Sequence, residues 1–355
     1  MDLPGPLAWL VDEAGASPGP DRFLAELGSR LLAEGVPLAG GALTLAVLHP
    51  IIARRTWLWR AETGAVIEAL GFGGALSDQS NQAGHEWLAG LGPVHETKVG
   101  PDPSGPVLGW AATRSFNSAE AGRLDQTARF AGAPLAALAA RAGLTALLEA
   151  YLGRRSAARV QAGALRRGAG ETIRAALLCA DLRDFTALSE ATEPMQMIAA
   201  LDAWFDRIAG AVHAFGGEVL KFIGDGVLAI FPVGGMPAEA CEAALRAVAA
   251  ARAGMAHLDA ARQAQSLPPL PFGAALHVGD ILWGNIGAAD RLDFTAIGPA
   301  VNLVSRLEGL CRPLGRSVLI SGAVAAETTT PLVPLGDHVL RGIAPPCAVF
   351  TLPDA

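Results

Sequence analysis

Cysteine is scarce in this sequence, and the few cysteines are widely spaced. The 355 residues include four, and no two of them have Cys-x-x-Cys spacing: Cys179, Cys241, Cys311 and Cys347. Disulfide frameworks and zinc sites usually show cysteines at short, regular spacings. The pattern therefore favours buried, reduced thiols over disulfides or a zinc site.

An excess of basic charge and a long apolar run are also lacking. Lysine and arginine number 27 against 34 aspartates and glutamates, which disfavours nucleic acids and anionic membrane surfaces as partners. No stretch reaches about 18 uncharged apolar residues, because the closest, 130–140, is followed by Arg141; no membrane insertion is expected. The first residues lack the basic start of a secretory signal, so the sequence predicts a soluble, cytoplasmic protein.

Length and composition predict two domains. At 355 residues the chain exceeds one ordinary domain, and its hydrophobic fraction of 51% is ample for two cores. Residues 1–20 are rich in proline and glycine, which predicts a flexible lead-in before the first domain.

Residues 21–142 predict a small α+β domain. Apolar residues at helical spacing predict a helix over 21–35, and Ser118 is the expected N-cap of a long helix over 118–140. Strand-like runs separated by turns lie between these helices, at 42–48, 55–59 and 107–113. This layout resembles a GAF-type sensory domain. No ligand signature accompanies it, so a small molecule, a protein or dimer packing alone stay open as its signal.

Residues 143–170 predict a helical linker. Leucines and a tyrosine recur at helical spacing and form a short apolar stripe: Leu144, Leu147, Leu148 and Tyr151. Such a stripe is typical either of core packing or of a parallel dimer seam. We favour the seam, which would pass the state of residues 21–142 to the second domain during signal transduction.

Residues 171–355 predict a second α+β domain with a mainly antiparallel sheet. Helices are expected after Thr192-Glu193-Pro194, where proline suits the first turn, and over 237–258 and 299–311. The apolar face assigned to the first of these helices comprises Ile198, Leu201, Phe205, Ile208 and Val212. Strands are expected at 173–180, 218–223, 227–231, 272–278, 281–286, 291–297, 318–321, 339–341 and 348–352.

Two carboxylates follow strands in this second domain. Gly224-Asp225-Gly226 lies between two short apolar runs and predicts a tight hairpin, because glycine accepts the positive φ that the turn needs. Asp181 directly follows the apolar run 175–180. Alone, Asp225 is a turn residue; together, two strand-end carboxylates can share divalent cations, which proteins use to bind nucleotide phosphates.

Three stretches of this domain resemble the class III nucleotide cyclases. They are ADLRDFT at 180–186, GGEVLKFIGDG at 216–226 and RLDFTAIGPAVNLVSRLE at 291–308. The resemblance covers about 171–355 and implies the class III cyclase fold, a ferredoxin-like βαββαβ core with a mainly antiparallel sheet. Asp184 departs from the family pattern, which often has glycine there, and Pro299 replaces a polar residue.

The resemblance implies a two-metal site. Asp181 and Asp225, with the backbone carbonyl of Leu182, would hold two Mg²⁺ or Mn²⁺ ions. The ribose 3′-hydroxyl would then attack the α-phosphate in line and expel pyrophosphate. ATP is the implied substrate and 3′,5′-cyclic AMP the product.

The resemblance also implies roles for polar residues. Lys221 and Thr295 would read adenine, whereas a guanine-reading site would have an acceptor such as Glu at 221. Asn302 and Arg306 lie four residues apart on one helix face; Asn302 would orient the ribose and Arg306 would stabilise charge on the α-phosphate. Arg341 would contact the triphosphate.

A head-to-tail homodimer is implied as well, because this family combines the metal carboxylates of one protomer with the other groups of its partner. An adenylate cyclase is therefore expected. The alternatives are a guanylate cyclase and a catalytically silent nucleotide-binding module, which would have lost some of these residues. A diguanylate cyclase is excluded, because Val219-Leu220 follow Gly216-Gly217-Glu218 where a second carboxylate is needed.

Overall fold

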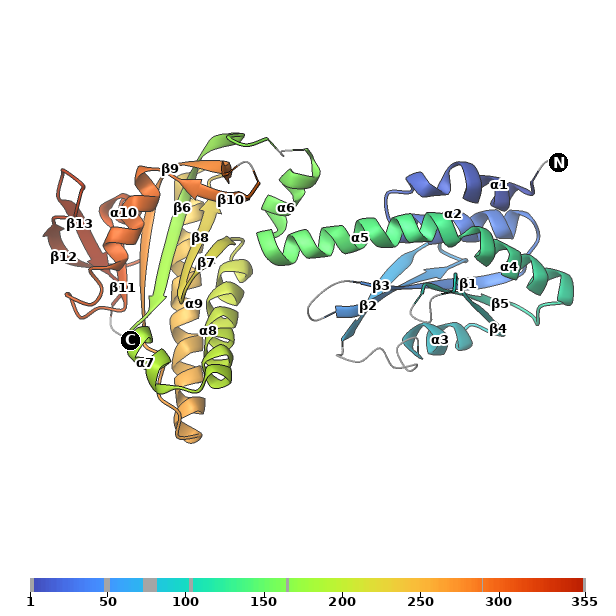
Figure 1. Cartoon of the computed structure of the whole chain (residues 1–355), viewed down its shortest axis with the longest axis horizontal. Coiled ribbons are helices and arrows are strands. Elements are labelled where there is room, and N and C mark those ends of the chain that lie inside the picture. Colours follow the sequence, from blue (N-terminus) through green and yellow to red (C-terminus); the bar gives the residue numbers. More distant parts are fainter. Residues whose placement is uncertain are drawn as a thin grey trace. The chain divides into compact units, whose positions relative to one another are not determined.

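The computed structural model describes residues 3–47, 52–72, 82–101, 105–163, 166–288 and 290–353. They fall into two compact units, Met1–Tyr151 and Leu152–Ala355 (Figure 1). The division lies inside the segment 143–170, which the sequence predicts to be a linker.

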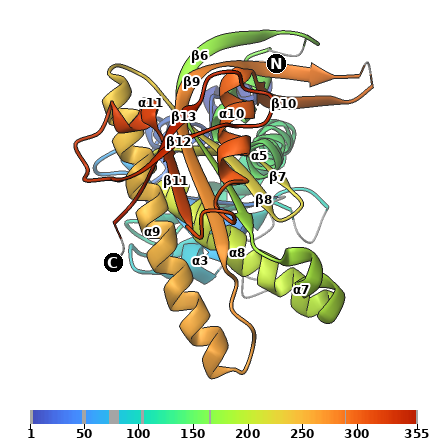
Figure 2. The same ribbon diagram turned by 90° about the vertical axis from the view of Figure 1, so that its left-hand side faces the viewer.

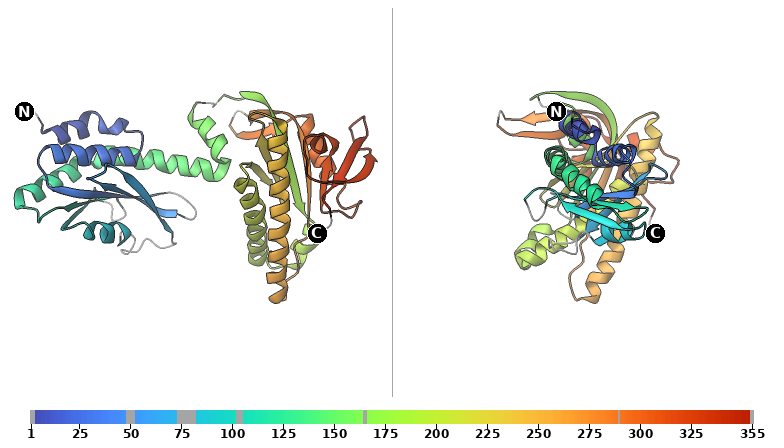
Figure 3. Two further views of the ribbon diagram at one scale, coloured as in Figure 1. Left: turned by 180° about the vertical axis from the view of Figure 1, so that it is seen from behind. Right: turned by 90° about the vertical axis from the view of Figure 1, so that its right-hand side faces the viewer.

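The first unit is an α+β domain, as predicted. Its antiparallel sheet has the order β3-β2-β1-β5-β4, with β1 Leu38–Ala46, β2 Ile52–Arg60, β3 Val66–Phe72, β4 Val94–Lys98 and β5 Val107–Ala112. One face is covered by α1 Gly5–Asp12, α2 Pro20–Ala33, α4 Ser118–Phe130 and α5 Gly132–Leu152, with a 3₁₀ turn at Ala14–Ala16. The other face carries α3 Gln82–Ala89 (Figure 3). The resemblance to a GAF domain stays a prediction.

The flexible lead-in predicted for residues 1–20 is wrong. Helix α1 lies there, and its Leu7 and Trp9 are buried in the core, where the Trp9 ring lies 5.4 Å from that of Phe23. Pro6 does not prevent this helix, because it occupies the first turn, where no backbone N–H is needed.

The helix predicted over 118–140 is also corrected. It is two helices, α4 and α5, which meet at Ala131. The N-cap of α4 is Asn117 and not Ser118: the Asn117 side chain accepts a hydrogen bond of 2.9 Å from the Glu120 backbone, and the Glu120 carboxylate accepts one from Asn117. This reciprocal capping box makes Ser118 the first residue of the helix, so the N-cap is one residue earlier than predicted.

The end of α5 carries the predicted apolar stripe. Leu144 and Tyr151 are 55% and 79% exposed in this structure. In the part of the chain that the structure describes, α5 is also the one helix whose length and apolar composition would suffice to cross a membrane. The absence of membrane insertion stays a prediction.

The second unit contains an eight-stranded sheet with the order β12-β13-β11-β9-β6-β8-β7, and β10 pairs with β9. The strands are β6 Gly170–Leu182, β7 Glu218–Ile223, β8 Gly226–Pro232, β9 Phe272–Gly287, β10 Leu292–Ile297, β11 Val318–Ser321, β12 Val333–His338 and β13 Cys347–Thr351. The helices are α6 Arg154–Gln161, α7 Phe185–Ala191, α8 Pro194–Ala214, α9 Pro237–Ala264, α10 Pro299–Glu308 and α11 Gly322–Ala325. Helices α8 and α9 lie along one face of the sheet, and α10 lies along the other (Figure 1).

The ferredoxin-like core is confirmed by the order of these elements. Along the chain, β6, α8, β7, β8, α9 and β9 follow the βαββαβ pattern. In the sheet, the four strands have the order β9-β6-β8-β7, and every neighbouring pair is antiparallel. Fold class and strand direction therefore agree with the class III cyclase fold.

Two strand predictions in this unit are wrong. The strands predicted at 272–278 and 281–286 are one strand, β9, because β6 pairs with it without interruption from Leu182↔Phe272 to Gly170↔Gly284. Figure 2 shows this long strand returning as β10. No strand forms at 339–341; β12 ends at His338, and residues 341–342 form a turn.

Candidate functional site

Asp181 and Asp225 come together at one end of the sheet. Asp181 is the penultimate residue of β6, and Asp225 lies in the turn that joins β7 to β8. The antiparallel pair Ala180↔Val227 brings the turn beside the end of β6. Gly224 has a φ of 65°, as the predicted hairpin requires, and a Cβ at Gly226 would lie 3.4 Å from Asp181 Oδ1. The pairing of β6 with β8 therefore brings the two carboxyl groups close enough to interact.

The pair is electrostatically unfavourable without a cation. Asp181 Oδ1 is buried and has no hydrogen-bond partner. Burial raises the pKa of Asp181 most. The neighbouring Asp225 carboxyl raises it further, first by a hydrogen bond between the two carboxyl groups, which requires a proton, and then by its like charge. A positive charge placed between these groups would relieve both effects.

The available donors fit a hard divalent cation. Both side chains offer carboxylate oxygens, and the backbone carbonyl of Leu182 lies next to Asp181 in β6. Over the described ranges, no group of three or more His, Cys, Asp and Glu side chains is arranged to hold a metal. Two carboxylates suit Mg²⁺ or Mn²⁺, because such ions keep several waters and complete their shell with substrate phosphates.

Trp204 of α8 holds the turn of Asp225, and sequence reasoning missed it. Its Nε1 donates a hydrogen bond of 2.8 Å to the Asp225 carbonyl, and the fully buried indole lies 5.2 Å from the Phe272 ring. The apolar face predicted for α8 is partly wrong, because Ile198 is 51% exposed. The predicted Leu201, Phe205, Ile208 and Val212 do pack against the core, but the buried face also includes Met197, Ala200 and Trp204. The four-residue spacing from Ala200 through Trp204 to Ile208 was the sequence signal for this face.

Lys221 and Thr295 lie on adjacent elements. Lys221 of β7 forms an ion pair with Asp293 of β10, and Thr295 is the next residue but one on that strand. Alternate residues of a strand point to the same face, so Asp293 and Thr295 share one side of β10. Thr295 is 7% exposed. Asp293 is a second residue that the sequence analysis did not single out, although it lies inside the 291–308 motif.

Asn302 and Arg306 are both exposed on α10, one turn apart. Asn302, His277 and Gly342 help to line a cavity of about 570 Å³. Arg341 precedes Gly342 in an exposed turn, which brings the predicted triphosphate contact to the border of this cavity. Burial, and then the nearby Arg174, lower the pKa of His277 to about 4, so its ring is neutral at physiological pH.

In the described residues, no hydrogen bond or ion pair joins Asp181 or Asp225 to Lys221, Asn302 or Arg306. The two carboxylates are called the metal half-site here, and Lys221, Thr295, Asn302 and Arg306 are called the nucleotide half-site.

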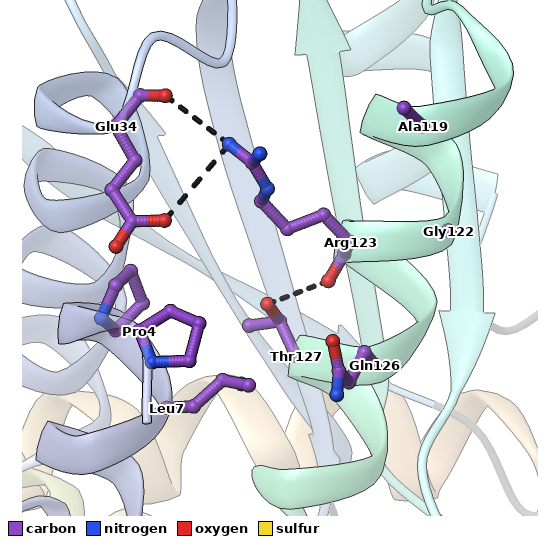
Figure 4. Close-up of a pocket in the computed structure, with 9 residues that line it drawn as sticks. Pro4, Leu7, Glu34, Ala119, Gly122, Arg123, Gln126 and Thr127 are labelled. Atoms are coloured by element: carbon purple, nitrogen blue, oxygen red, sulfur yellow. Dashed lines mark hydrogen bonds and ion pairs between the residues drawn. The ribbon is translucent and has the colours of Figure 1, made fainter. Parts of the chain in front are cut away.

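Two other cavities lie away from these residues. Figure 4 shows a cavity of about 250 Å³ in the first unit, where Arg123 donates a hydrogen bond of 3.1 Å to the Glu34 carbonyl and faces its carboxylate. This volume is below the ~300 Å³ of ordinary small-molecule sites. A cavity of about 720 Å³ in the second unit is lined mainly by apolar side chains of α7, α8 and α9, including Leu188, Met197 and Leu258. Neither contains a residue of the half-sites.

Comparison with known proteins identifies the second unit. Residues 169–333 match the family model of the adenylate and guanylate cyclase catalytic domain. Adenylate cyclase 1 of Rhizobium meliloti is 36% identical over 147 residues, 41% of this chain and 22% of that protein. An adenylate cyclase of Anabaena cylindrica is 32% identical over 168 residues, 46% of this chain and 32% of that protein. The chain thus spans about a quarter to a third of these curated relatives.

A solved structure supports the fold. A bacterial light-regulated adenylyl cyclase superposes with a TM-score of 0.53, covering 88% of this chain and 92% of that one at 17% identity. Residues 169–333 therefore form an adenylate and guanylate cyclase catalytic domain, with the carboxylate pair at the edge of its ferredoxin-like core.

Proposed function

We propose that this protein is an adenylate cyclase that converts ATP to 3′,5′-cyclic AMP and pyrophosphate. The observation that carries the proposal is the pair Asp181 and Asp225, two mutually repelling carboxylates within a cyclase catalytic domain. Two carboxylates held this close would destabilise the metal-free fold when both are ionised, and bound cations with a polyphosphate would offset that cost.

The proposed reaction closes a ring within the nucleotide. Asp181, Asp225 and the Leu182 carbonyl would hold two Mg²⁺ or Mn²⁺ ions, which when bound offset the phosphate charge and lower the pKa of the ribose 3′-hydroxyl. The 3′-oxygen gives its proton to solvent water and bonds to the α-phosphorus, while the bond from that phosphorus to the leaving pyrophosphate breaks. Asn302 hydrogen-bonds and orients the ribose. Arg306 stabilises the charge that develops on the α-phosphate, and Arg341 binds the triphosphate.

Base selection rests on Lys221 and Thr295. The Lys221 ammonium can donate to N1 of adenine, which is an acceptor, whereas N1 of guanine carries a hydrogen and would oppose it. The Thr295 hydroxyl can accept from the adenine amino group. A guanylate cyclase, the nearest alternative, would present an acceptor at position 221.

The Lys221→Glu variant tests this base selection. We expect the ratio of kcat/KM for ATP to that for GTP to fall about 10- to 100-fold, the worth of one charge-assisted hydrogen bond. The measurement is initial-rate kinetics with both nucleotides, beside Lys98→Glu, an exposed strand residue of the first unit, as control. An unchanged ratio would remove Lys221 from base recognition.

A homodimer would complete each site. In the family pattern, carboxylates of one protomer face the ribose and phosphate groups of the other, and this chain carries residues of both kinds. Apolar side chains stand exposed beside the Asp225 turn, with Phe222 49% and Ile223 62% exposed, as a surface for a second copy requires. The exposed stripe of α5 would form a dimer seam of its own and pass an unidentified small-molecule or protein signal from the first unit.

A direct assay tests the activity. Purified full-length protein is given ATP or GTP with Mg²⁺ or Mn²⁺, and cyclic nucleotide is quantified by chromatography. Cyclic AMP is the expected main product; cyclic GMP would overturn the assignment of Lys221 and Thr295. A silent nucleotide-binding module would give no product, from either the full chain or residues 171–355.

A further inference from the structure

Arg183 and Glu308 form a partly buried ion pair close to the proposed metal residues. Arg183 follows Leu182 directly, and Glu308 is the last residue of α10. Arg183 Nη2 donates a hydrogen bond of 2.7 Å to Glu308 Oε1, and the two side chains are only 20% and 11% exposed. The pair therefore connects the end of the strand that carries Asp181 to the helix that carries Asn302 and Arg306.

A glycine makes this connection possible. Gly273 of β9 lies directly opposite Asp181 in the sheet, and a Cβ at that position would overlap the Arg183 guanidinium. The φ of Gly273 is not in the left-handed region, so the requirement is for space and not for backbone conformation. Arg183 thus crosses the sheet over the bare backbone of Gly273 to reach α10.

Two further contacts hold the segments that surround this ion pair. Asp184 has a φ of 55°, which turns the chain sharply after β6, and its carboxylate lies 3.1 Å from the Arg312 guanidinium. Cys311 Sγ donates to the carbonyl of Ala274, beside Gly273, at 3.4 Å. The exposed Asp184–Arg312 pair adds little stability by itself. The Asp184–Arg312 pair nevertheless connects the segment after β6 to the segment after α10 at a second point.

We propose that Arg183 and Glu308 are positioning residues, which set the orientation of α10 and therefore of Arg306 relative to the strand of Asp181. This inference rests on the proposed cyclase function. A buried ion pair commonly gives no more stability than an apolar pair of the same size. We therefore assign to this pair a role in orienting α10 and not in stabilising the fold. In a head-to-tail dimer, Asp181 and Arg306 of one chain serve different sites, and the pair then links the two sites mechanically.

The Gly273→Ala variant tests the proposal without altering any proposed catalytic group. The added methyl group displaces the Arg183 guanidinium, which can move because it is the free end of a long side chain. We expect kcat to fall about 10- to 100-fold, the usual cost of a small misplacement of reacting groups, with KM for ATP nearly unchanged. A kcat within twofold of wild type would overturn the proposal.

A double variant separates positioning from stability. Glu308→Gln alone leaves the Arg183 charge buried without its partner, so the melting temperature should drop together with kcat. Arg183→Met with Glu308→Met removes both charges and should recover the melting temperature, but kcat should stay at least about tenfold low. Recovery of kcat together with stability would show that the pair is only structural, and would refute the inference.

The Arg159–Glu171 ion pair supplies the matched control, because Glu171 lies near the opposite end of the same strand, β6. Glu171→Gln should leave kcat and KM unchanged. If wild-type protein forms no cyclic nucleotide, the proposed function fails; if wild type is active and the double variant is equally active, only the positioning role fails.

Discussion

Replacing Asp181 by asparagine is expected to lower cyclic AMP formation by on the order of a thousandfold, because cation binding contributes several kcal/mol to such a reaction. The same change should leave the metal-free protein as stable as wild type or more so. Asp181 Oδ1 has no hydrogen-bond partner, and both burial and Asp225 disfavour the ionised form of Asp181. The ionised carboxylate therefore destabilises the metal-free fold.

The pH dependence of the free energy of unfolding shows whether the ionised Asp181 stabilises or destabilises the metal-free protein. The pKa of Asp181 is raised in the folded state, so between its ordinary value near ~4 and the raised value the folded protein binds more protons than the unfolded one. The free energy of unfolding of the metal-free protein should therefore fall as pH rises through that window. In Asp181→Asn this contribution disappears.

Urea unfolding in EDTA at pH 5 and pH 8 measures the difference, with Asp202→Asn, an exposed residue of α8, as control. If Asp181→Asn instead lowers the free energy of unfolding at both pH values, Asp181 has a structural role in the fold.

Arg306→Ala is expected to lower kcat about 100- to 1,000-fold while KM for ATP changes little, since the guanidinium acts on charge that appears only in the transition state. Arg306→Lys should recover a small part of the rate, because an ammonium keeps the charge but not the planar fork. Steady-state kinetics with ATP measure both variants. Arg246→Ala, an exposed arginine of α9, should match wild type. A rise in KM with an unchanged kcat would show that Arg306 binds ATP equally well before and during the reaction, and would contradict its role in the transition state.

Mixing Asp181→Asn with Arg306→Ala tests where the two halves of a site come from. In a head-to-tail homodimer, a mixed dimer has one site built from an intact carboxylate pair and an intact arginine. Random exchange should then restore about a quarter of wild-type activity, although each variant alone is nearly inactive. If mixing restores nothing, each site is built from a single chain.

The carboxylate site could be found from sequence because its signals are local. Gly224-Asp225-Gly226 has the turn chemistry of a hairpin, and the run 175–180 marks Asp181 as a strand-end residue. The α+β class and the mainly antiparallel sheet likewise follow from elements that are recognisable by their own periodicity, whereas the ferredoxin-like order came from the resemblance to the cyclases.

The contacts that position the site could not be predicted in the same way. Trp204 and Asp225 are 21 residues apart, Lys221 and Asp293 are 72 apart, and Arg183 and Glu308 are 125 apart. Which side chains meet over such separations depends on the register of β6 with β9 and on the rotation of each helix. The apolar face assigned to α8 included Leu201 and Phe205 but left out Trp204, which lies between them in sequence and is more deeply buried.

The bare backbone at Gly273 also constrains how this sequence can change over evolutionary time. As long as position 183 is arginine, a side chain at 273 collides with it, so glycine is held there by a residue 90 positions away. A lineage that first replaces Arg183 by a shorter residue can then accept alanine at 273. A lineage that first replaces Gly273 by alanine, while Arg183 is still present, is expected to have a lower kcat. Positions 183, 273 and 308 should therefore vary together among relatives, and the order of their substitutions should be recoverable from reconstructed ancestors.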